Sequence, residues 1–79
     1  MLTGAQIRAA RALLGWTSQT LADRSGVSTS TITRAERVDG VPRMRTDRLD
    51  AIQLSLEQGG VAFIDANSTS GAGVRFRRP

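Results

Sequence analysis

Apolar residues recur three or four positions apart through most of the first 58 residues, which is the spacing of amphipathic helices. Turn-forming residues at Gly15, Gly26 and Asp39-Gly40 interrupt the pattern, and the segments between them predict helices at about 4–14, 18–25, 29–36 and 46–58. The expected inward positions are all apolar: Ile7, Ala10, Leu14, Leu21, Ala22, Val27, Ile32, Ala35, Leu49, Ile52 and Leu56. The pattern therefore predicts a mainly α protein with one small core.

Polar residues mark the starts of the first three predicted helices. Thr3 and Gln6 have the spacing of a capping box, in which each side chain binds the other residue's backbone N–H group. Thr17 and Ser28 stand directly before the second and third helices, where a hydroxyl can accept from free N–H groups. Trp16 follows a helix-ending glycine, so we expect it to pack at the edge of the core rather than to stack on a ligand.

The third predicted helix has outward positions that carry hydroxyl and guanidinium groups. They are Thr29, Ser30, Thr33, Arg34 and Arg37. Serine and threonine are poor helix formers, so an exposed helix rich in them indicates a role other than stability. These groups contact phosphates and base edges in DNA, which predicts a helix that reads a groove.

Beyond Gly59-Gly60 the pattern changes from helical to extended. Residues 61–65 have strand character, residues 73–77 alternate apolar with basic, and residues 66–72 are small or polar, which together predict a β-hairpin. A lone hairpin is marginal in water, so it should pack on the helices or pair with a second copy. The alternative is a disordered basic tail. In either case Arg75, Arg77 and Arg78 could contact DNA, although solvated charge is the simpler interpretation. We therefore divide the chain into residues 1–60, a DNA-binding unit, and residues 61–79, a hairpin or tail and a candidate dimerisation element.

Composition narrows the function further. The chain of 79 residues contains eleven arginines, no lysine and seven acidic residues, and its net charge of +4 suits a polyanionic partner, although an arginine-rich composition alone would also produce it. It contains no cysteine and no histidine, which excludes disulfides, thiolate metal sites, zinc hydrolases and Ser–His–Asp or Cys–His catalysis. Asp47 and Asp50 fit the dipole at the start of the fourth helix better than a catalytic pair. The sequence predicts no enzyme, no metal and no cofactor.

No apolar run approaches the roughly 20 residues that a membrane-spanning helix needs. The first predicted helix is amphipathic and contains two arginines, so no signal peptide is evident. We expect a cytoplasmic protein with no membrane partner.

The run L-A-x-x-x-G-V-S-x-x-x-I-x-x-x-E resembles the helix-turn-helix of the phage repressor and Cro family, also called the XRE family. Its positions in this chain are Leu21, Ala22, Gly26, Val27, Ser28, Ile32 and Glu36. With the flanking segments, the resemblance covers about residues 3–58. It implies a four-helix bundle of the repressor/Cro type whose second helix crosses the DNA backbone and whose third helix lies in the major groove.

The resemblance also implies which residues contact DNA. By position, Thr29, Ser30 and Thr33 are candidate base readers, and Arg34 and Arg37 could reach a guanine or a phosphate. The further candidates lie at helix starts or in the loop after the third helix: Thr17, Ser18, Ser28, Arg43 and Arg45. Ser28 is expected to serve mainly as a cap, and the two loop arginines are equally well explained as solvated charges.

Two features bear on how far the family pattern transfers. In the resembled family, the arginine at the position of Arg11 pairs with the glutamate at the position of Glu36 and ties the first helix to the recognition helix. Many members have glutamine where this chain has Ser18, and several have another where it has Thr29, so their paired-glutamine reading of adenine is absent. Arginine would then carry most of the sequence specificity.

These observations lead to two hypotheses of different classes. The first is a sequence-specific transcriptional regulator, a repressor that could control its own operon, which binds a double-stranded DNA operator as a homodimer. The second is a protein-interaction module such as an antitoxin or antiactivator, whose protein partner would dock on an exposed patch of Phe63, Ile64 and Phe76.

Overall fold

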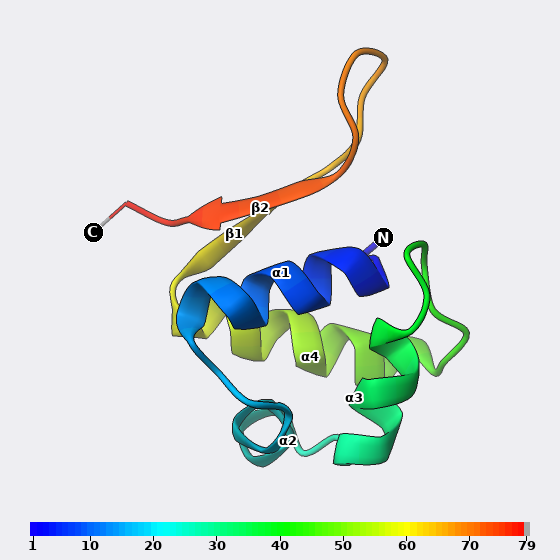
Figure 1. The fold of residues 1–79 in the computed structure, drawn as a ribbon, viewed down its shortest axis with the longest axis vertical. Coiled ribbons are helices and arrows are strands. Elements are labelled where there is room, and N and C mark those ends of the chain that lie inside the picture. The colour runs from blue at the N-terminus through cyan, green and yellow to red at the C-terminus, as the bar shows by residue number, and fades with distance from the viewer. Residues whose placement is uncertain (79) are drawn as a thin grey trace.

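The computed structural model describes residues 1–78 and contains four helices followed by a two-stranded antiparallel sheet (Figure 1). The elements are α1 (Gly4–Leu14), α2 (Ser18–Ser25), α3 (Thr29–Glu36), α4 (Thr46–Gly59), β1 (Val61–Ile64) and β2 (Gly73–Phe76). This order confirms the predicted fold class of a mainly helical domain with a C-terminal hairpin. The last residue of the predicted segment 61–79 lies outside the described residues.

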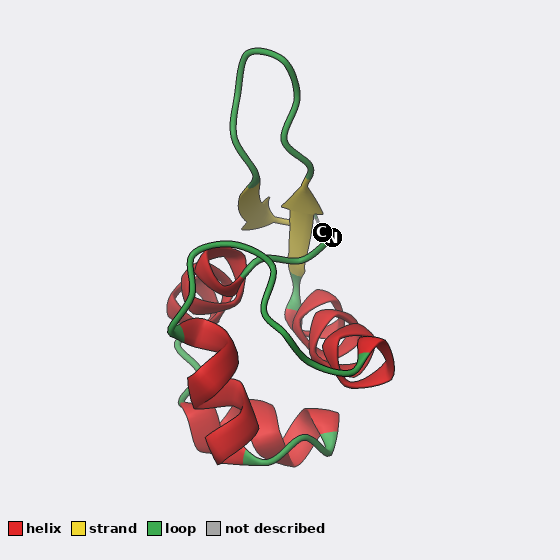
Figure 2. Cartoon of the chain, turned by 90° about the vertical axis from the view of Figure 1, so that its right-hand side faces the viewer, coloured by secondary structure: helices red, strands yellow, loops and turns green. Residues whose placement is uncertain are grey.

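The core lies between α1, α4 and the α2–α3 pair. Helices α1 and α4 form a central layer, with α2 and α3 on one side of it and the hairpin on the other (Figures 1 and 2). Nine of the eleven predicted inward residues are buried, and Leu14 and Ala22 pack against them half-buried. Leu2 and Val61 are also buried, which extends the core to the residue before the capping box and to the first residue of β1.

The caps form as the sequence predicts. The Oγ1 of Thr3 accepts from the Gln6 N–H at 3.1 Å, and the Oε1 of Gln6 accepts from the Thr3 N–H at 2.9 Å. Thr17 caps α2 through the Thr20 N–H at 3.1 Å, and Ser28 caps α3 through the Thr31 N–H at 3.3 Å. Local hydrogen bonding therefore sets the starts of the first three helices.

Trp16 packs at the edge of the core, as expected. Its ring lies over Gly59, where an added Cβ would stand 2.6 Å from the ring atom Cζ2. The Arg24 guanidinium stacks on the ring with its Cζ 4.6 Å from the ring centroid, within cation–π range. The missing side chain at Gly59 thus allows α4 to approach the indole closely.

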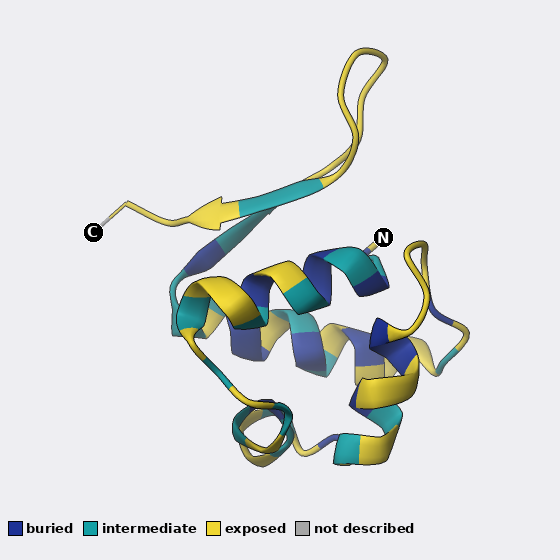
Figure 3. Ribbon diagram, viewed as in Figure 1, coloured by how far each residue is buried: buried dark blue, intermediate teal, exposed yellow. Residues whose placement is uncertain are grey.

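The hairpin packs one face onto the helices. Its register pairs Val61 with Phe76, Ala62 with Arg75, Phe63 with Val74 and Ile64 with Gly73. Val61 is buried and Phe63 and Val74 are half-buried against the core, with β2 over α1 and β1 in contact with both α1 and α4 (Figure 3). The hairpin is therefore part of the domain and not an independent tail.

Gln6 connects the hairpin to the start of α1. Beyond its role in the capping box, its Nε2 donates to the Ile64 carbonyl at 3.2 Å and to the Gly73 carbonyl at 2.9 Å. Only 5% of the residue is exposed. One amide side chain therefore stabilises both the first turn of α1 and the last residue pair of the hairpin.

Replacing Gln6 with glutamate should separate these two roles. The carboxylate keeps the acceptor for the Thr3 N–H but loses both donors to the hairpin and places an oxygen against two carbonyls. Because unmatched buried acceptors cost about 1–3 kcal/mol, we expect hydrogen-exchange protection in β1 and β2 to fall by about tenfold or more. NMR-detected exchange measures this, with Gln58→Glu on the exposed side of α4 as the control. Equal protection in Gln6→Glu and the control would contradict the role.

Candidate nucleic-acid interface

The α2–turn–α3 unit is held by a small apolar contact and a left-handed glycine. Gly26 has φ of 74°, which a side chain would strain, and its N–H donates to the Ala22 carbonyl at 2.9 Å. Leu21 and Ile32 are fully buried, and Val27 between the helices is 6% exposed. The turn therefore fixes α3 relative to α2 by packing and by backbone conformation together.

The outward face of α3 is available at the surface. Ser30, Thr33, Arg34 and Arg37 are exposed and Thr29 is half-buried, while Ile32 and Ala35 fill the core on the opposite side. The helix therefore presents hydroxyls near its first turn and guanidinium groups near its end, in the places that the sequence predicts.

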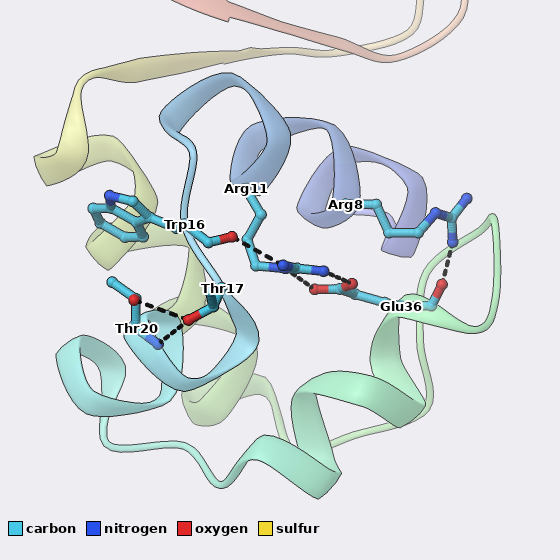
Figure 4. Close-up of polar contacts among 6 residues, drawn as sticks. All are labelled: Arg8, Arg11, Trp16, Thr17, Thr20 and Glu36. Atoms are coloured by element: carbon cyan, nitrogen blue, oxygen red, sulfur yellow. Dashed lines mark hydrogen bonds and ion pairs between the residues drawn. The ribbon is translucent and has the colours of Figure 1, made fainter.

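Ser28 and Thr17 are engaged in local hydrogen bonds. Ser28 Oγ donates to Thr31 Oγ1 at 2.9 Å in addition to capping α3. Thr17 Oγ1 accepts from the Thr20 N–H and lies 3.0 Å from the Thr20 hydroxyl (Figure 4). Both hydroxyls are exposed, so a phosphate at either helix start would share them with the cap. Ser18, in the first turn of α2, is half-buried.

Arg11 and Glu36 form a two-point ion pair between α1 and the end of α3. Arg11 Nε lies 2.8 Å from Glu36 Oε2, and Arg11 Nη2 lies 2.8 Å from Glu36 Oε1 (Figure 4). A third guanidinium donor reaches the Trp16 carbonyl at 2.9 Å. The Glu36 side chain is only 10% exposed and that of Arg11 is 24% exposed. The hydrogen bond to Glu36 raises the pKa of Arg11 above its usual value, although burial opposes the shift.

Arg8 is a second anchor for α3, and the sequence interpretation did not identify it. Its guanidinium donates to the carbonyl of Glu36 (Figure 4), and also to the Val38 carbonyl at 3.3 Å and to Asp39 Oδ1 at 2.6 Å. A cation at the carbonyl end of a helix complements its dipole. The available signal was the spacing, because Arg8 stands three residues before Arg11 and thus on the same side of α1.

The first residue of α1 touches the segment that follows α3. The Gly4 N–H donates to the Gly40 carbonyl at 2.8 Å. A Cβ at Gly4 would lie well inside 3.0 Å of the carbonyl oxygens of Ala35 and Val38. The end of the recognition helix is therefore held against α1 by contacts with Gly4, Arg8 and Arg11.

A groove of about 610 Å³ separates the end of α3, the following loop and the start of α4. Four arginines line it together with apolar and hydroxyl groups: Thr31, Arg34, Ala35, Val38, Val41, Pro42, Arg43, Met44, Arg45 and Arg48. The structure thus brings the predicted Arg34, Arg43 and Arg45 to one surface and adds Arg48, which the sequence interpretation missed. Arg45 already has an ion-pair partner, because its guanidinium binds both carboxylate oxygens of Asp47 at 2.9 and 3.1 Å.

The sequence of this region matches a known family. A family model described as "Helix-turn-helix" matches residues 7–46, which is half of the chain. The chain belongs to the helix-turn-helix family. It is a member of the XRE/Cro-like type, and DNA binding follows from the domain. No curated protein matches the chain significantly.

The matched range includes the candidate DNA-contacting residues from Thr17 to Arg45. Arg48 and the hairpin lie outside it, so the helix-turn-helix assignment by itself says nothing about them. Among the helices of the described residues, none is long and apolar enough to span a bilayer.

Proposed function

We propose that this helix-turn-helix protein is a sequence-specific transcriptional regulator that acts in the cytoplasm as a homodimer on a two-fold-related operator. The supporting observation is the exposed hydroxyl and guanidinium face of α3, held on α1 by Arg8 and by the buried Arg11–Glu36 pair. A surface helix that is this firmly oriented can present its outward side chains to a groove with little loss of freedom on binding. Repression follows if the operator overlaps the promoter, including that of its own operon.

The residues divide by role. Thr29, Ser30 and Thr33 would contact base edges, where threonine methyls favour thymine, and Arg34 and Arg37 would contact guanine or phosphate. Phosphates would be held by the remaining candidates: Thr17, Ser18, Ser28, Arg43 and Arg45. These contacts supply affinity and register, whereas the arginines on α3 supply most of the sequence preference.

The hairpin is the dimerisation element that we propose. A two-stranded sheet has two open edges, and pairing one of them with a second copy would cover it. β1 carries no arginine, so two copies of its edge can approach without opposing like charges. The two recognition helices should then contact half-sites about one helical turn, roughly 10 base pairs, apart.

Footprinting of the protein's own upstream region tests the proposal directly. We expect one protected region with two-fold symmetry, and complex formation that weakens steeply as salt rises, because phosphate contacts release counterions. An asymmetric footprint over a single half-site would contradict the homodimer, and the absence of protection on any upstream sequence would contradict the regulatory role.

Replacing Arg34 or Arg37 with alanine should weaken operator binding by about 10- to 100-fold, since one good base contact is worth about 1–3 kcal/mol. Both side chains are exposed, so the melting temperature should not change. Gel-shift titration measures the affinity, and Arg77→Ala on the hairpin is the matched control. If both α3 variants bind like the wild type, the assignment of α3 as the reading helix is wrong.

A further inference from the structure

The end of β2 concentrates positive charge away from the recognition helix. Arg75, Arg77 and Arg78 fall within four residues of one another and are all exposed. The three ion pairs among residues 1–78 are Arg8–Asp39, Arg11–Glu36 and Arg45–Asp47, and none of them involves this cluster. The hairpin lies on the opposite side of the α1–α4 layer from α3 (Figure 1), so a duplex bound by α3 would not reach it.

Apolar surface lies beside this charge. Phe76 is 57% exposed and, with Ala62 and the three arginines, lines a hollow of about 450 Å³. The side of α1 that faces solvent is also apolar, because Ala9, Ala12 and Leu13 are all exposed. The end of β2 passes over the C-terminal end of α1 (Figure 3), so these groups belong to one side of the molecule.

The backbone of β2 supplies the third feature. The Arg77 N–H donates to the Gly60 carbonyl, which makes this a hydrogen-bonded pair of the antiparallel ladder. Hydrogen-bonded and non-hydrogen-bonded pairs alternate along such a ladder. The backbone N–H and C=O groups of Val74 and Phe76, which belong to non-hydrogen-bonded pairs, therefore point away from β1. They form an open strand edge above α1. A third strand added there would hydrogen-bond to Val74 and Phe76 and would cover the apolar side of α1.

The positions of the side chains determine what such a strand must contain. Arg75 shares the outer face of the sheet with Ala62, and Phe76 shares the inner face with Val61. Residues of the added strand beside Arg75 and Arg77 would therefore be acidic, and those beside Phe76 would be apolar. A second copy of β2 would oppose arginine with arginine, which is unfavourable. Bare phosphates would leave Phe76 and Leu13 without an apolar partner.

We propose that the open edge of β2 binds an extended protein segment that alternates acidic and apolar residues, adding it to the sheet over α1. Its acidic side chains pair with Arg75 and Arg77, and its apolar side chains cover Phe76, Leu13 and Ala9. The protein would then have two separate binding surfaces, α3 for DNA and the β2 edge for this segment. The inference does not depend on the operator or on repression.

Synthetic nine-residue peptides test this on the full chain without DNA. A peptide of alternating glutamate and valine should bind, and should slow hydrogen exchange at the amides of Val74 and Phe76. Peptides of alternating lysine and valine, or of alternating glutamate and serine, should bind at least about tenfold more weakly, since one has repelling charge and the other lacks apolar contact. Similar binding of all three peptides, or unchanged exchange at Val74 and Phe76, would overturn the proposal.

Charge-reversed variants of the protein complete the test. Arg75→Glu together with Arg77→Glu should weaken the glutamate–valine peptide by about tenfold or more and should favour the lysine–valine peptide instead. Arg37→Gln on α3 is the control and should bind the glutamate–valine peptide like the wild type. If a random-sequence duplex protects Val74 and Phe76 in place of the peptide, the surface binds nucleic acid and the proposal is wrong.

Discussion

Replacing Glu36 with alanine should lower the free energy of unfolding by about 3 kcal/mol, because it leaves a partly buried guanidinium without its carboxylate. Of the three acceptor oxygens that Arg11 now contacts, only the Trp16 carbonyl would remain. Small domains have total stabilities of about 5–15 kcal/mol, so this loss is a large fraction of the whole. Urea denaturation followed by the fluorescence of Trp16 measures it, since that ring lies at the edge of the core.

Two further variants decide whether the loss comes from the unpaired charge. Replacing both partners, Arg11→Met with Glu36→Leu, removes the charge and the need for a partner, so we expect most of the stability to return. Asp50→Ala removes an exposed carboxylate and should change stability by less than about 0.5 kcal/mol. If Glu36→Ala behaves like Asp50→Ala, the pair contributes no more than an exposed surface ion pair.

The pH dependence of the pair follows from Arg11. Its pKa is raised in the folded state by the hydrogen bond to Glu36, so its contribution is fully present below the pKa of arginine in the unfolded chain. That contribution is lost only as pH rises through the higher folded-state value, in strongly alkaline solution. The Arg11 guanidinium therefore stays charged, and keeps its part of the ion pair, throughout the neutral and mildly alkaline pH range.

Features set by neighbouring residues could be predicted from the sequence. The helix bounds follow from caps and glycines within four residues of the positions they define, as at Thr3 with Gln6 and Thr17 with Thr20. The exposed face of α3 follows from helical periodicity alone. The Arg11–Glu36 pair is different, because it joins residues 25 apart in the chain, and the family resemblance rather than the spacing pointed to it.

Features that depend on the approach of distant segments could not be predicted. Gln6 reads as a capping residue in the sequence, and its bonds to residues 58 and 67 positions away require the hairpin to be in place. From the sequence alone Arg8 is predicted to be a solvated charge, because its partners at the end of α3 come close to it only in the folded domain. Arg48 reads as one of several exposed residues on α4, and its place in the basic groove depends on the path of the loop before it.

Gly4→Ala should destabilise the domain by about 3 kcal/mol, although alanine is favoured over glycine in helices by up to about 1 kcal/mol. The added Cβ would overlap the carbonyl oxygens of Ala35 and Val38, which belong to the backbone and cannot rotate away as a side chain can. The start of α1 would have to move from the end of α3 and would strain the bond from the Gly4 N–H to the Gly40 carbonyl.

The same displacement should weaken operator binding, because α1 carries both arginines that hold α3 in position. Gly40→Ala is the matched control, since a Cβ there would have no atom within 4 Å, so its stability should stay close to that of the wild type. Thermal melting followed by circular dichroism compares the two variants, and gel shift compares their operator affinities. A Gly4→Ala protein as stable as Gly40→Ala would mean that α1 and α3 can separate without loss, and that close seating of the recognition helix is not what orients it.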